Sequence, residues 1–322
     1  MTTTSEPYAE GRLPSSPIRS GAMMNMPTAR EREPLLSIVT VCRNAASTIG
    51  STLDSVDRCF SSDADDVEHL VLDGRSTDAT LAIIEAHASS IRRHLSEADS
   101  GMYDAMNKGL RMARGEYVWF LNADDRLHAD FMHTRSALMT ALHDRRPAVL
   151  VGEIQMFRFS SGALRRTRYW QAPRRLARAA RWGWHPPHPA FVARRASLID
   201  LGGFDLSKSV AADFKLMTQA IRQAGLENVS IFPHPLVAMQ EGGASNRSVR
   251  AIFLANGQCY SSLREVGFSR WSAGLQICMK LTRKIGQRLS RTPARGLNPL
   301  GGAAAEDLSL DKVAAAPGRV HG

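Results

Sequence analysis

The sequence predicts an α/β fold built around a parallel sheet, and three features of the first part of the chain indicate it. Short runs of β-branched and aromatic residues at 36–42, 67–72 and 117–121 are typical of strands buried inside a sheet. Segments with apolar residues at helical spacing separate these runs. Strand and helix alternate through short polar joins, as in βαβ units, whose strands run parallel.

The first two strands each lead into a helix. After the strand at 36–42, apolar residues at steps of three and four mark an amphipathic helix. After the strand at 67–72, a helix is expected to begin near Asp78, with Thr77 or Asp78 as its N-cap. This order repeats the strand–helix unit that a parallel sheet requires.

The stretch at 96–125 carries the most information about a site. It predicts a turn, a helix with Ser100 as N-cap, a stop at Gly115 and a buried strand at 117–121. Three polar residues follow the strand directly: Asn122, Asp124 and Asp125. Adjacent carboxylates repel one another, and a hard divalent cation with its bound phosphate oxygens would relieve that repulsion. A solvated turn is the alternative, because Asn and Asp are common turn residues.

Three loops are expected at the same edge of the sheet, where open α/β sheets bind their ligands. They span 40–44, 73–78 and 122–125. A carboxylate such as Asp73 can accept N–H groups of uracil or guanine; the alternative is that Asp73 and Asp78 only cap and turn. Neither a G-x-G-x-x-G after the first strand nor a G-x-x-x-x-G-K-[ST] occurs, which disfavours dinucleotide dehydrogenases and P-loop phosphotransferases.

Four stretches, in order and with matching spacing, resemble family 2 glycosyltransferases of the GT-A fold. They are SIVTVCRNAASTIGSTLDSV, VLDGRSTDAT, SGMYDAMNKGLRMARGEYVWFLNADD and GGFDLSKSVAADFKLM. The resemblance covers roughly residues 35–245 and is nearest to the bacterial exopolysaccharide or colanic-acid-type branch. It implies an open mixed sheet flanked by helices, a UDP- or GDP-linked sugar donor, Mg²⁺ or Mn²⁺, and inversion at the anomeric carbon.

The resemblance also implies roles for residues that bind the sugar donor. Thr40, Val41 and Arg43 match the donor-binding segment of the first strand. Asp73 matches the acid that contacts the base. Lys108 matches a helix position from which an ammonium can pair with the diphosphate, although a solvated helix charge is the alternative.

Further implied roles concern the metal and the reaction. Asp124 matches the metal and diphosphate residue of a D-x-D-type motif, but this chain has Asn122 where many relatives carry the first Asp. Asp125 is placed beside the donor sugar or the metal. Asp213 matches the catalytic acid pair, here Ala-Asp rather than Glu-Asp, and is the implied general base. On local sequence alone Asp213 reads as a helix N-cap.

Basic residues are concentrated in two stretches that contain no acid. Ten Arg lie between 158 and 195, and six Lys or Arg lie between 270 and 291, although the net charge of the whole chain is only +10. This segregation indicates a polyanionic partner, either nucleic acid or an anionic membrane. The first stretch interleaves Arg with Trp and can also bind the pyrophosphate of a lipid-linked acceptor; a solvated loop is the alternative. Trp182, Trp184 and His188 are the candidate acceptor residues.

The predicted organisation has four parts. Residues 1–33 form a disordered tail, 34–247 the GT-A domain, 248–291 C-terminal helices, and 292–322 a second disordered tail. The basic amphipathic helix after 270 is suited to an anionic membrane surface, with packing against the domain as the alternative. Scattered Cys and the lack of a secretory signal or a membrane-spanning run indicate a cytoplasmic protein. If the basic helix binds a membrane, the protein is peripheral at the inner face of the plasma membrane.

These observations predict an inverting transfer of a sugar to a saccharide acceptor, linked to polyprenyl diphosphate, in cell-surface polysaccharide biosynthesis. The prediction requires Asp73, Asp124 and Asp213 to line a common cleft. One alternative is a catalytically silent relative that scaffolds polysaccharide assembly at the membrane. The other, less favoured, is a metal-dependent nucleic-acid-binding protein or nuclease.

Overall fold

A computed structural model describes most of the chain after Arg32. The described residues are 33–61, 66–160, 163–173, 175–181, 183–240 and 249–289. The chain divides into two compact units, residues 1–32 and 33–322, and every described residue belongs to the second. The predicted tail at 292–322, and all but the last residue of the predicted tail at 1–33, lie outside the described residues.

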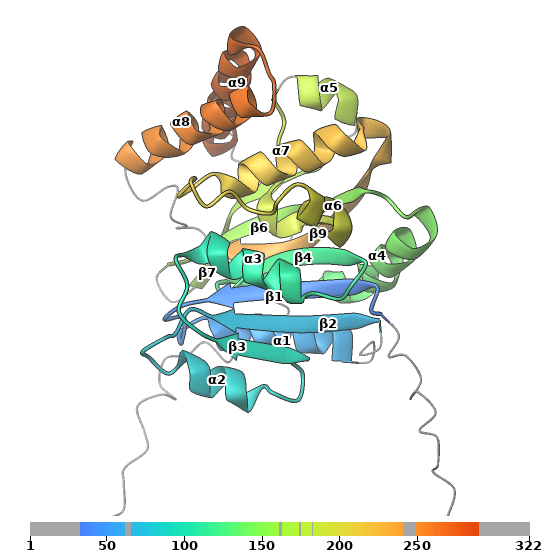
Figure 1. Cartoon of the computed structure of the whole chain (residues 1–322), viewed down its shortest axis with the longest axis vertical. Helices are drawn as coiled ribbons and strands as arrows, with labels where there is room; N and C mark the ends of the chain where they lie inside the picture. The colour runs from blue at the N-terminus through green and yellow to red at the C-terminus, as the bar shows by residue number, and fades with distance from the viewer. Residues whose placement is uncertain are drawn as a thin grey trace, which may run out of the picture. The chain divides into compact units, whose positions relative to one another are not determined.

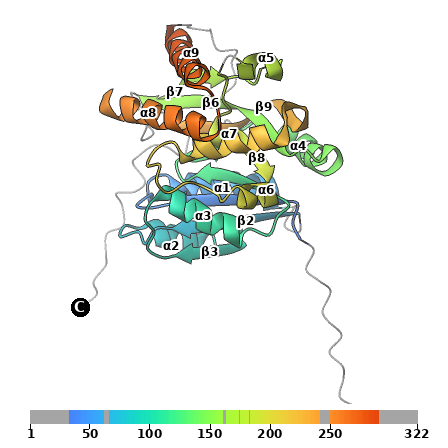
Figure 2. The ribbon, with the colours of Figure 1, turned by 45° about the horizontal axis from the view of Figure 1, so that its top comes forward.

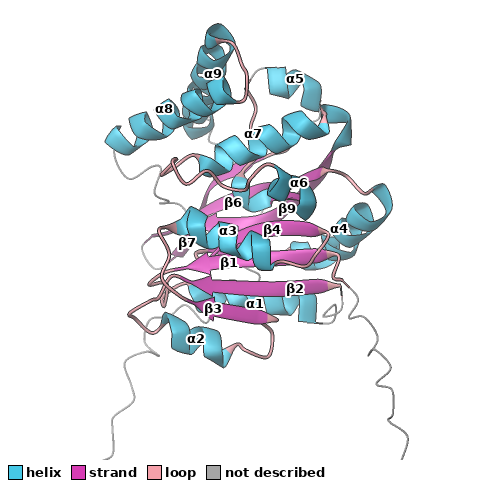
Figure 3. Ribbon diagram, in the orientation of Figure 1, coloured by secondary structure: helices cyan, strands magenta, loops and turns pink. Residues whose placement is uncertain are grey.

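Within the described residues, nine strands form one mixed sheet (Figure 3). They are β1 (Leu36–Cys42), β2 (Val67–Asp73), β3 (Arg93–Ser96), β4 (Tyr117–Asn122), β5 (Asp125–Leu127), β6 (Val149–Ser160), β7 (Ala163–Trp170), β8 (Phe191–Arg194) and β9 (Val229–Gln240). The order is β3-β2-β1-β4-β8-β6-β9-β5, with β7 paired to β6. β3, β2, β1 and β4 run parallel, whereas β8 is antiparallel to both β4 and β6. The predicted α/β class with an open mixed sheet is therefore confirmed.

Helices cover both faces of this sheet (Figures 1 and 2). They are α1 (Ile49–Phe60), α2 (Thr80–Ala86), α3 (Met102–Met112), α4 (Phe131–Arg145), α5 (Leu176–Arg181), α6 (Arg195–Asp200), α7 (Ala212–Ala224), α8 (Val249–Glu265) and α9 (Arg270–Leu289), with short 3₁₀ turns at His188–Ala190 and Leu226–Asn228. One hydrophobic cluster joins the sheet to α3, α6 and α7, and a second joins its other face to α1 and α4. α8 and α9 pack beyond α7 through a smaller cluster.

The central strands are buried on both faces, which explains their continuous apolar sequences. Every residue of β1 and β2 is buried. In β1, Leu36 and Ile38 enter the cluster beneath α1 and α4, whereas Val39 and Val41 enter the cluster beneath α3 and α7. Two-sided burial leaves no solvent face to carry polar residues, so the pattern is a run rather than an alternation.

Two helix starts differ from the prediction. The N-cap of α3 is Gly101 rather than Ser100, and Gly101 has φ of 133°, a conformation that favours glycine. The N-cap of α2 is Ala79, and Asp78 instead accepts a hydrogen bond from the Thr80 N–H at 3.0 Å. In both cases a polar side chain next to the helix start was mistaken for the cap.

The C-terminal helices do not have the length and hydropathy of a membrane span. Among the described residues, no helix is both long enough and apolar enough to cross a bilayer. In α9, Ala273 and Ile277 face the hydrophobic cluster with α7 and α8. Trp271 and Leu275 of the same helix are exposed, so membrane contact by this helix stays a prediction.

Gly115, in the loop between α3 and β4, allows a close backbone contact with the start of β1. A Cβ at this position would lie 2.6 Å from the Ser37 nitrogen and 2.8 Å from the Leu36 carbonyl carbon. We expect Gly115→Ala to lower the free energy of unfolding by about 1–3 kcal/mol, because the clash is with backbone. Urea denaturation followed by circular dichroism measures this change.

The matched control is Gly257→Ala in α8. A Cβ at Gly257 meets nothing within 4 Å. Because Ala is the better helix former, the free energy of unfolding of this variant should rise by up to about 1 kcal/mol. Equal stability of Gly115→Ala and the wild type would contradict the packing described.

Candidate active site

The carboxyl ends of β1, β2 and β4 meet at one edge of the sheet. The parallel register pairs Cys42 with Asp73 and Val41 with Asn122. The loops after these three strands therefore share the edge where the βαβ pattern predicts a ligand site. Thr40 and Val41 are buried in the sheet, whereas Arg43 is exposed at its edge.

Hydrogen bonds join the first two edge loops. Asn44, at φ of 51°, accepts the Thr77 N–H at 2.8 Å, and its own N–H donates to Ser76 Oγ at 2.7 Å. The Ala45 N–H donates to Thr80 Oγ1 at 2.8 Å. These bonds fix the loops relative to each other before any ligand binds.

The Asp73 carboxylate accepts hydrogen bonds from its own turn and from β3. Its side chain is 3% exposed. It accepts the Ser76 N–H at 3.0 Å and the Ser96 hydroxyl at 2.6 Å, and it also accepts the Ser76 hydroxyl. This is the capping arrangement expected of a turn carboxylate. Contact between Asp73 and a nucleotide base stays a prediction.

Some oxygens of the polar residues after β4 lack a hydrogen-bond partner among the described residues. Asp125 is 1% exposed, and its Oδ2 accepts the Asn122 side-chain N–H at 3.1 Å. Asn122 Oδ1 and Asp125 Oδ1 are buried without a hydrogen-bond partner among the described residues. Burial and the neighbouring Asp124 charge raise the pKa of Asp125 well above its usual value. Asp124 is exposed, and partial desolvation of its carboxylate raises its pKa as well.

Such a set of oxygens fits a hard divalent cation. Unpartnered carboxylate and amide oxygens are the ligand type that Mg²⁺ and Mn²⁺ prefer, and a cation would offset the cost of the adjacent charges. The described residues contain no group of three or more His, Cys, Asp or Glu side chains placed to hold a metal. A cation here would therefore need ligands besides these described side chains, such as diphosphate oxygens.

A cavity of about 730 Å³ opens beside this edge. Its walls come from β4, β6, β7, the 183–189 segment, and α5, α7, α8 and α9. Asn122 and Asp213 both line it. It reaches the sheet edge at Asn122. Of the three carboxylates predicted to line a common cleft, Asp213 lines this cavity, whereas Asp73 and Asp124 are not among its lining residues.

Asp213 stands at the start of α7. The N-cap of this helix is Ala211, so the N-cap interpretation of Asp213 is wrong. Asp213 Oδ1 accepts the Phe214 N–H at 2.8 Å and lies 3.1 Å from the Tyr103 hydroxyl, which also donates to the Val210 carbonyl at 2.9 Å. Tyr103, in the middle of an apolar helical pattern, was not found from the sequence.

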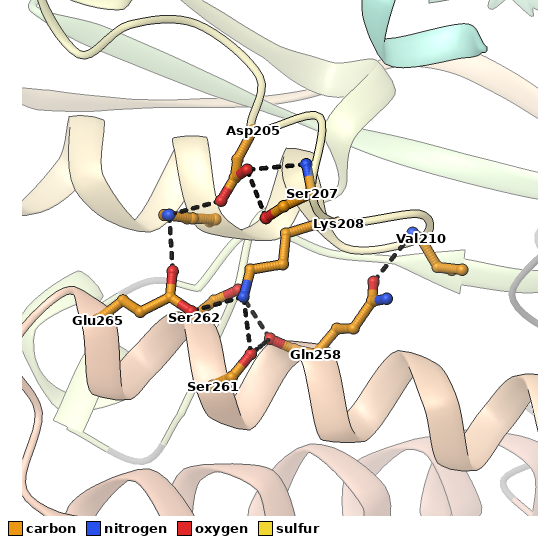
Figure 4. Close-up of polar contacts among 9 residues, drawn as sticks. Asp205, Ser207, Lys208, Val210, Gln258, Ser261, Ser262 and Glu265 are labelled. Atoms are coloured by element: carbon orange, nitrogen blue, oxygen red, sulfur yellow. Dashed lines mark hydrogen bonds and ion pairs between the residues drawn. The ribbon is translucent and has the colours of Figure 1, made fainter. Parts of the chain in front are cut away.

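Polar contacts also hold the loop before Asp213 to α8 (Figure 4). The Val210 N–H donates to Gln258 Oε1 at 3.0 Å. The Lys208 ammonium contacts Ser261 Oγ at 3.0 Å and Glu265 at 2.5 Å. The position of the Asp213 carboxylate thus depends on both α3 and the first C-terminal helix.

The predicted acceptor residues lie on the cavity wall where they are described. His188 stacks on Phe120 with ring centroids 5.8 Å apart, and burial lowers its pKa, partly offset by the Asp213 charge. Trp184 packs against Trp170 at 5.4 Å, and its indole nitrogen has no hydrogen-bond partner among the described residues. Trp182 lies outside the described residues.

His185 is a cavity residue that the sequence did not single out. Its ring stacks on Phe214 at 3.8 Å, and its Nε2 lies 2.9 Å from Thr218 Oγ1. Burial, aided by the Lys280 charge, lowers its pKa to about 3, so the ring is neutral at physiological pH. A group with this pKa is a poor proton acceptor near neutrality.

Lys108 is paired within its own neighbourhood. Its ammonium lies 2.8 Å from Glu97 and 3.8 Å from Asp104, and it donates to the Ala98 carbonyl. These contacts support the alternative of a local helix charge. A contact between Lys108 and a diphosphate stays a prediction.

A comparison of the sequence with protein families decides the class of the protein. Residues 37–202, about half of the chain, match the model of glycosyl transferase family 2. The chain belongs to this family. The predicted resemblance to family 2 glycosyltransferases is confirmed, whereas the exopolysaccharide branch stays a prediction. The matched segment carries the three edge loops of this glycosyltransferase.

Curated relatives agree with this assignment. The chain is 30% identical over 227 residues to a PGL/p-HBAD biosynthesis glycosyltransferase of Mycobacterium tuberculosis, covering 69% of this chain and 83% of the relative. It is 28% identical over 187 residues to an uncharacterized glycosyltransferase of Mycobacterium tuberculosis, covering 58% and 69%.

Solved structures share the fold of this glycosyltransferase. Residues 1–349 of TarS from S. aureus superpose with a TM-score of 0.56 at 18% identity, covering 80% of this chain and 73% of that fragment. The mannosyltransferase PcManGT from Pyrobaculum calidifontis gives 0.54 at 19% identity, covering 87% and 81%. At these identities the likeness concerns the fold alone.

The Tyr103–Asp213 contact predicts a catalytic defect without a binding defect. We expect Tyr103→Phe to lower kcat for sugar transfer roughly tenfold, because a hydrogen bond to a charged group is lost. Affinity for the sugar nucleotide, measured by calorimetry, should stay unchanged. Initial rates of nucleotide release give kcat.

Tyr117→Phe is the matched control. The Tyr117 hydroxyl is also buried and donates to the Pro147 carbonyl at 3.0 Å, away from the cavity. Its loss should affect stability and leave kcat near the wild-type value. If Tyr103→Phe also kept the wild-type kcat, Tyr103 would have no role in positioning Asp213.

Proposed function

We propose that this glycosyltransferase moves a sugar from a UDP- or GDP-linked donor to a hydroxyl group of a saccharide acceptor, with inversion at the anomeric carbon. The observation that carries the proposal is that Asn122, at the sheet edge, and Asp213, at the start of α7, line one cavity. A reaction between two bound substrates needs both groups to open into the same space. Solved neighbours of this fold include complexes with UDP, UDP-GlcNAc and GDP-Man.

Asp213 is the proposed general base. It takes the proton of the acceptor hydroxyl, whose oxygen bonds to the anomeric carbon as the bond between that carbon and the diphosphate oxygen breaks. Both hydrogen bonds to the carboxylate from described residues fall on Oδ1, which leaves Oδ2 for the acceptor hydroxyl. The diphosphate leaves without protonation, so the paired carboxylates of a glycosidase are not needed.

The residues after β4 are the proposed metal and diphosphate site. Asp124 would hold Mg²⁺ or Mn²⁺, with Asn122 and Asp125 beside it. When bound, the cation neutralises charge that develops on the leaving diphosphate. The unpartnered oxygens of Asn122 and Asp125 and the raised pKa values of both Asp residues support this assignment.

The other edge loops are proposed to hold the rest of the sugar donor. Asp73 would contact the base, and Thr40 and Val41, buried in β1, would support the donor-binding loop that follows this strand. Arg43 is exposed at the edge and would pair with the diphosphate. The bonds that join the loops at Asn44 and Thr77 support a preformed site.

The acceptor is proposed to be a lipid-linked saccharide of cell-surface polysaccharide biosynthesis. The support is the exposed apolar surface of the C-terminal helices, where Phe253 is 75% and Trp271 is 90% exposed. No acid occurs between 270 and 291, which suits an anionic membrane at the inner face of the plasma membrane. His188 and Trp184 would contact the saccharide within the cavity.

Nucleotide release from a panel of sugar nucleotides tests the function and the metal assignment together. With Mn²⁺ present, we expect UDP or GDP release to fall roughly 100-fold in Asp124→Ala, because the leaving diphosphate loses its counter-charge. Chelation with EDTA should lower release by the wild type similarly, and added Mn²⁺ should restore it.

Asp144→Ala is the control, since Asp144 is an exposed carboxylate at the end of α4. This variant should release nucleotide at the wild-type rate. Absence of release from every donor would favour the silent scaffold. Release that is unaffected by both EDTA and Asp124→Ala would contradict the metal assignment.

Asp213→Asn separates base catalysis from binding. The amide keeps the shape of the side chain and can still accept from Tyr103, but it cannot take a proton. We expect transfer to fall by roughly 10²–10⁴-fold, the usual contribution of a general base. The calorimetric affinity for the sugar nucleotide should be retained; loss of that affinity would contradict the assignment.

A further inference from the structure

The cavity wall carries more cations than carboxylates. Among the described residues that line it, four are permanent cations, Arg168, Arg175, Arg178 and Lys280, and one is a carboxylate, Asp213. A cavity with this balance creates a positive potential that attracts an anion. The reaction needs only Asp213 from this set, so the cations require a separate explanation.

Lys280 reaches the cavity from α9, outside the segment that matches the family. Its ammonium lies 3.0 Å from Cys259 Sγ on α8 and 4.8 Å from the ring centroid of Phe214 on α7. Burial raises the pKa of Cys259, so its thiol stays protonated and offers no negative charge. No carboxylate of the described residues forms an ion pair with Lys280. A thiol and a ring face are weak partners for a cation with three N–H groups.

This cation stands close to the proposed base. Phe214, beneath the Lys280 ammonium, directly follows Asp213. Lys280 also contributes to the lowered pKa of His185, whose ring stacks on Phe214. Lys280 is therefore placed where it would meet the part of an acceptor that lies next to the reacting hydroxyl.

Two Arg residues reach the same wall because the segment after α5 lies against α9. Gly183, at φ of 66°, is so near α9 that a Cβ would lie 2.9 Å from Gln276 Cα. Gln276 is one helical turn before Lys280. Figures 1 and 2 show α5 beside α9 in both views. Arg175 and Arg178 have no ion pair with a carboxylate in the described part of the chain.

We propose that Lys280, Arg175 and Arg178 form a subsite for a phosphate or diphosphate group of the acceptor. Guanidinium groups match phosphate oxygens in pairs, and the ammonium adds a point charge. The unpartnered indole N–H of Trp184 lies on the same wall and can donate to a further oxygen. A volume of about 730 Å³ accommodates both a sugar ring and such a group.

The inference rests on the proposed function, because it assigns the anion to the acceptor rather than to the sugar donor. It makes α9 part of the acceptor site as well as a candidate membrane contact. The phosphate can belong to a lipid-linked acceptor or to a water-soluble one. The two sources share the subsite and differ in the group attached to the phosphate.

Calorimetry with defined probes tests the subsite. Metal-free wild type is titrated with farnesyl diphosphate below its micellar concentration, with inorganic pyrophosphate, and with farnesol. We expect farnesyl diphosphate to bind, and Lys280→Gln and Arg178→Gln each to weaken it roughly tenfold. Tighter binding of farnesyl diphosphate than of pyrophosphate would identify the lipid-linked source, and equal binding the soluble one.

Two controls address folding and nonspecific charge effects. Lys280→Arg keeps the cation and should bind within about threefold of the wild type. Arg270→Gln removes an exposed cation from the same helix, outside the cavity, and should bind as the wild type does. Thermal unfolding of each variant checks that α9 remains packed. Equal weakening by Arg270→Gln and Lys280→Gln, or binding of farnesol alone, would overturn the proposal.

The same variants distinguish this proposal from the proposed function. Lys280→Gln should retain the Mn²⁺-dependent affinity for UDP or GDP and the acceptor-independent release of nucleotide. If Lys280→Gln lost them, the cations would serve the diphosphate of the sugar donor, and the proposal would be wrong. If the wild type released nucleotide from no donor but still bound farnesyl diphosphate through Lys280, the subsite would stand and the proposed function would fail.

Discussion

The Tyr103 hydroxyl, shared between the Val210 carbonyl at 2.9 Å and Asp213 Oδ1 at 3.1 Å, joins two parts of the molecule that are far apart in sequence. Tyr103 belongs to α3, which packs on β1 and β2 beside the edge loops. Asp213 begins α7, whose preceding loop is held by α8 through Lys208 and Gln258. The geometry between the sheet edge and the proposed base therefore depends on this contact, since each partner is fixed by a different set of elements.

Among the described residues, oxygens without a positive partner lie on one side of the site, and cations without a negative partner lie on the other. At the end of β4, buried or crowded oxygens of Asn122, Asp124 and Asp125 lack a positive partner among the described residues. On the α5–α9 side, Arg178 and Lys280 lack a negative partner in the described part of the chain. The buried oxygens of Asn122 and Asp125 do not stabilise the free protein, because buried polar groups without partners cost free energy. Together the oxygens and the cations suit a reaction that unites a metal-bound diphosphate with an anionic acceptor.

The sequence predicted the elements whose position depends on burial, and it missed contacts that depend on the packing of helix faces. β1 and β4 were found within one residue because two-sided burial leaves a continuous apolar run. Tyr103 and Lys280 were missed as site residues because helical spacing identifies an apolar stripe but not its neighbour. In α9 the small residue Ala273 packs inward and Trp271 faces outward, the reverse of what residue size suggests.

The central claim is that the sheet edge and the Asp213 carboxylate serve one reaction space. A crystal structure with Mn²⁺ and the nucleoside diphosphate identified by the donor panel measures this most directly. The account predicts anomalous density for Mn²⁺ at the Asp124 carboxylate, the diphosphate beside Asn122, and an open cavity in front of Asp213. Metal and diphosphate bound against Lys280 and Arg178, or away from the end of β4, would contradict it.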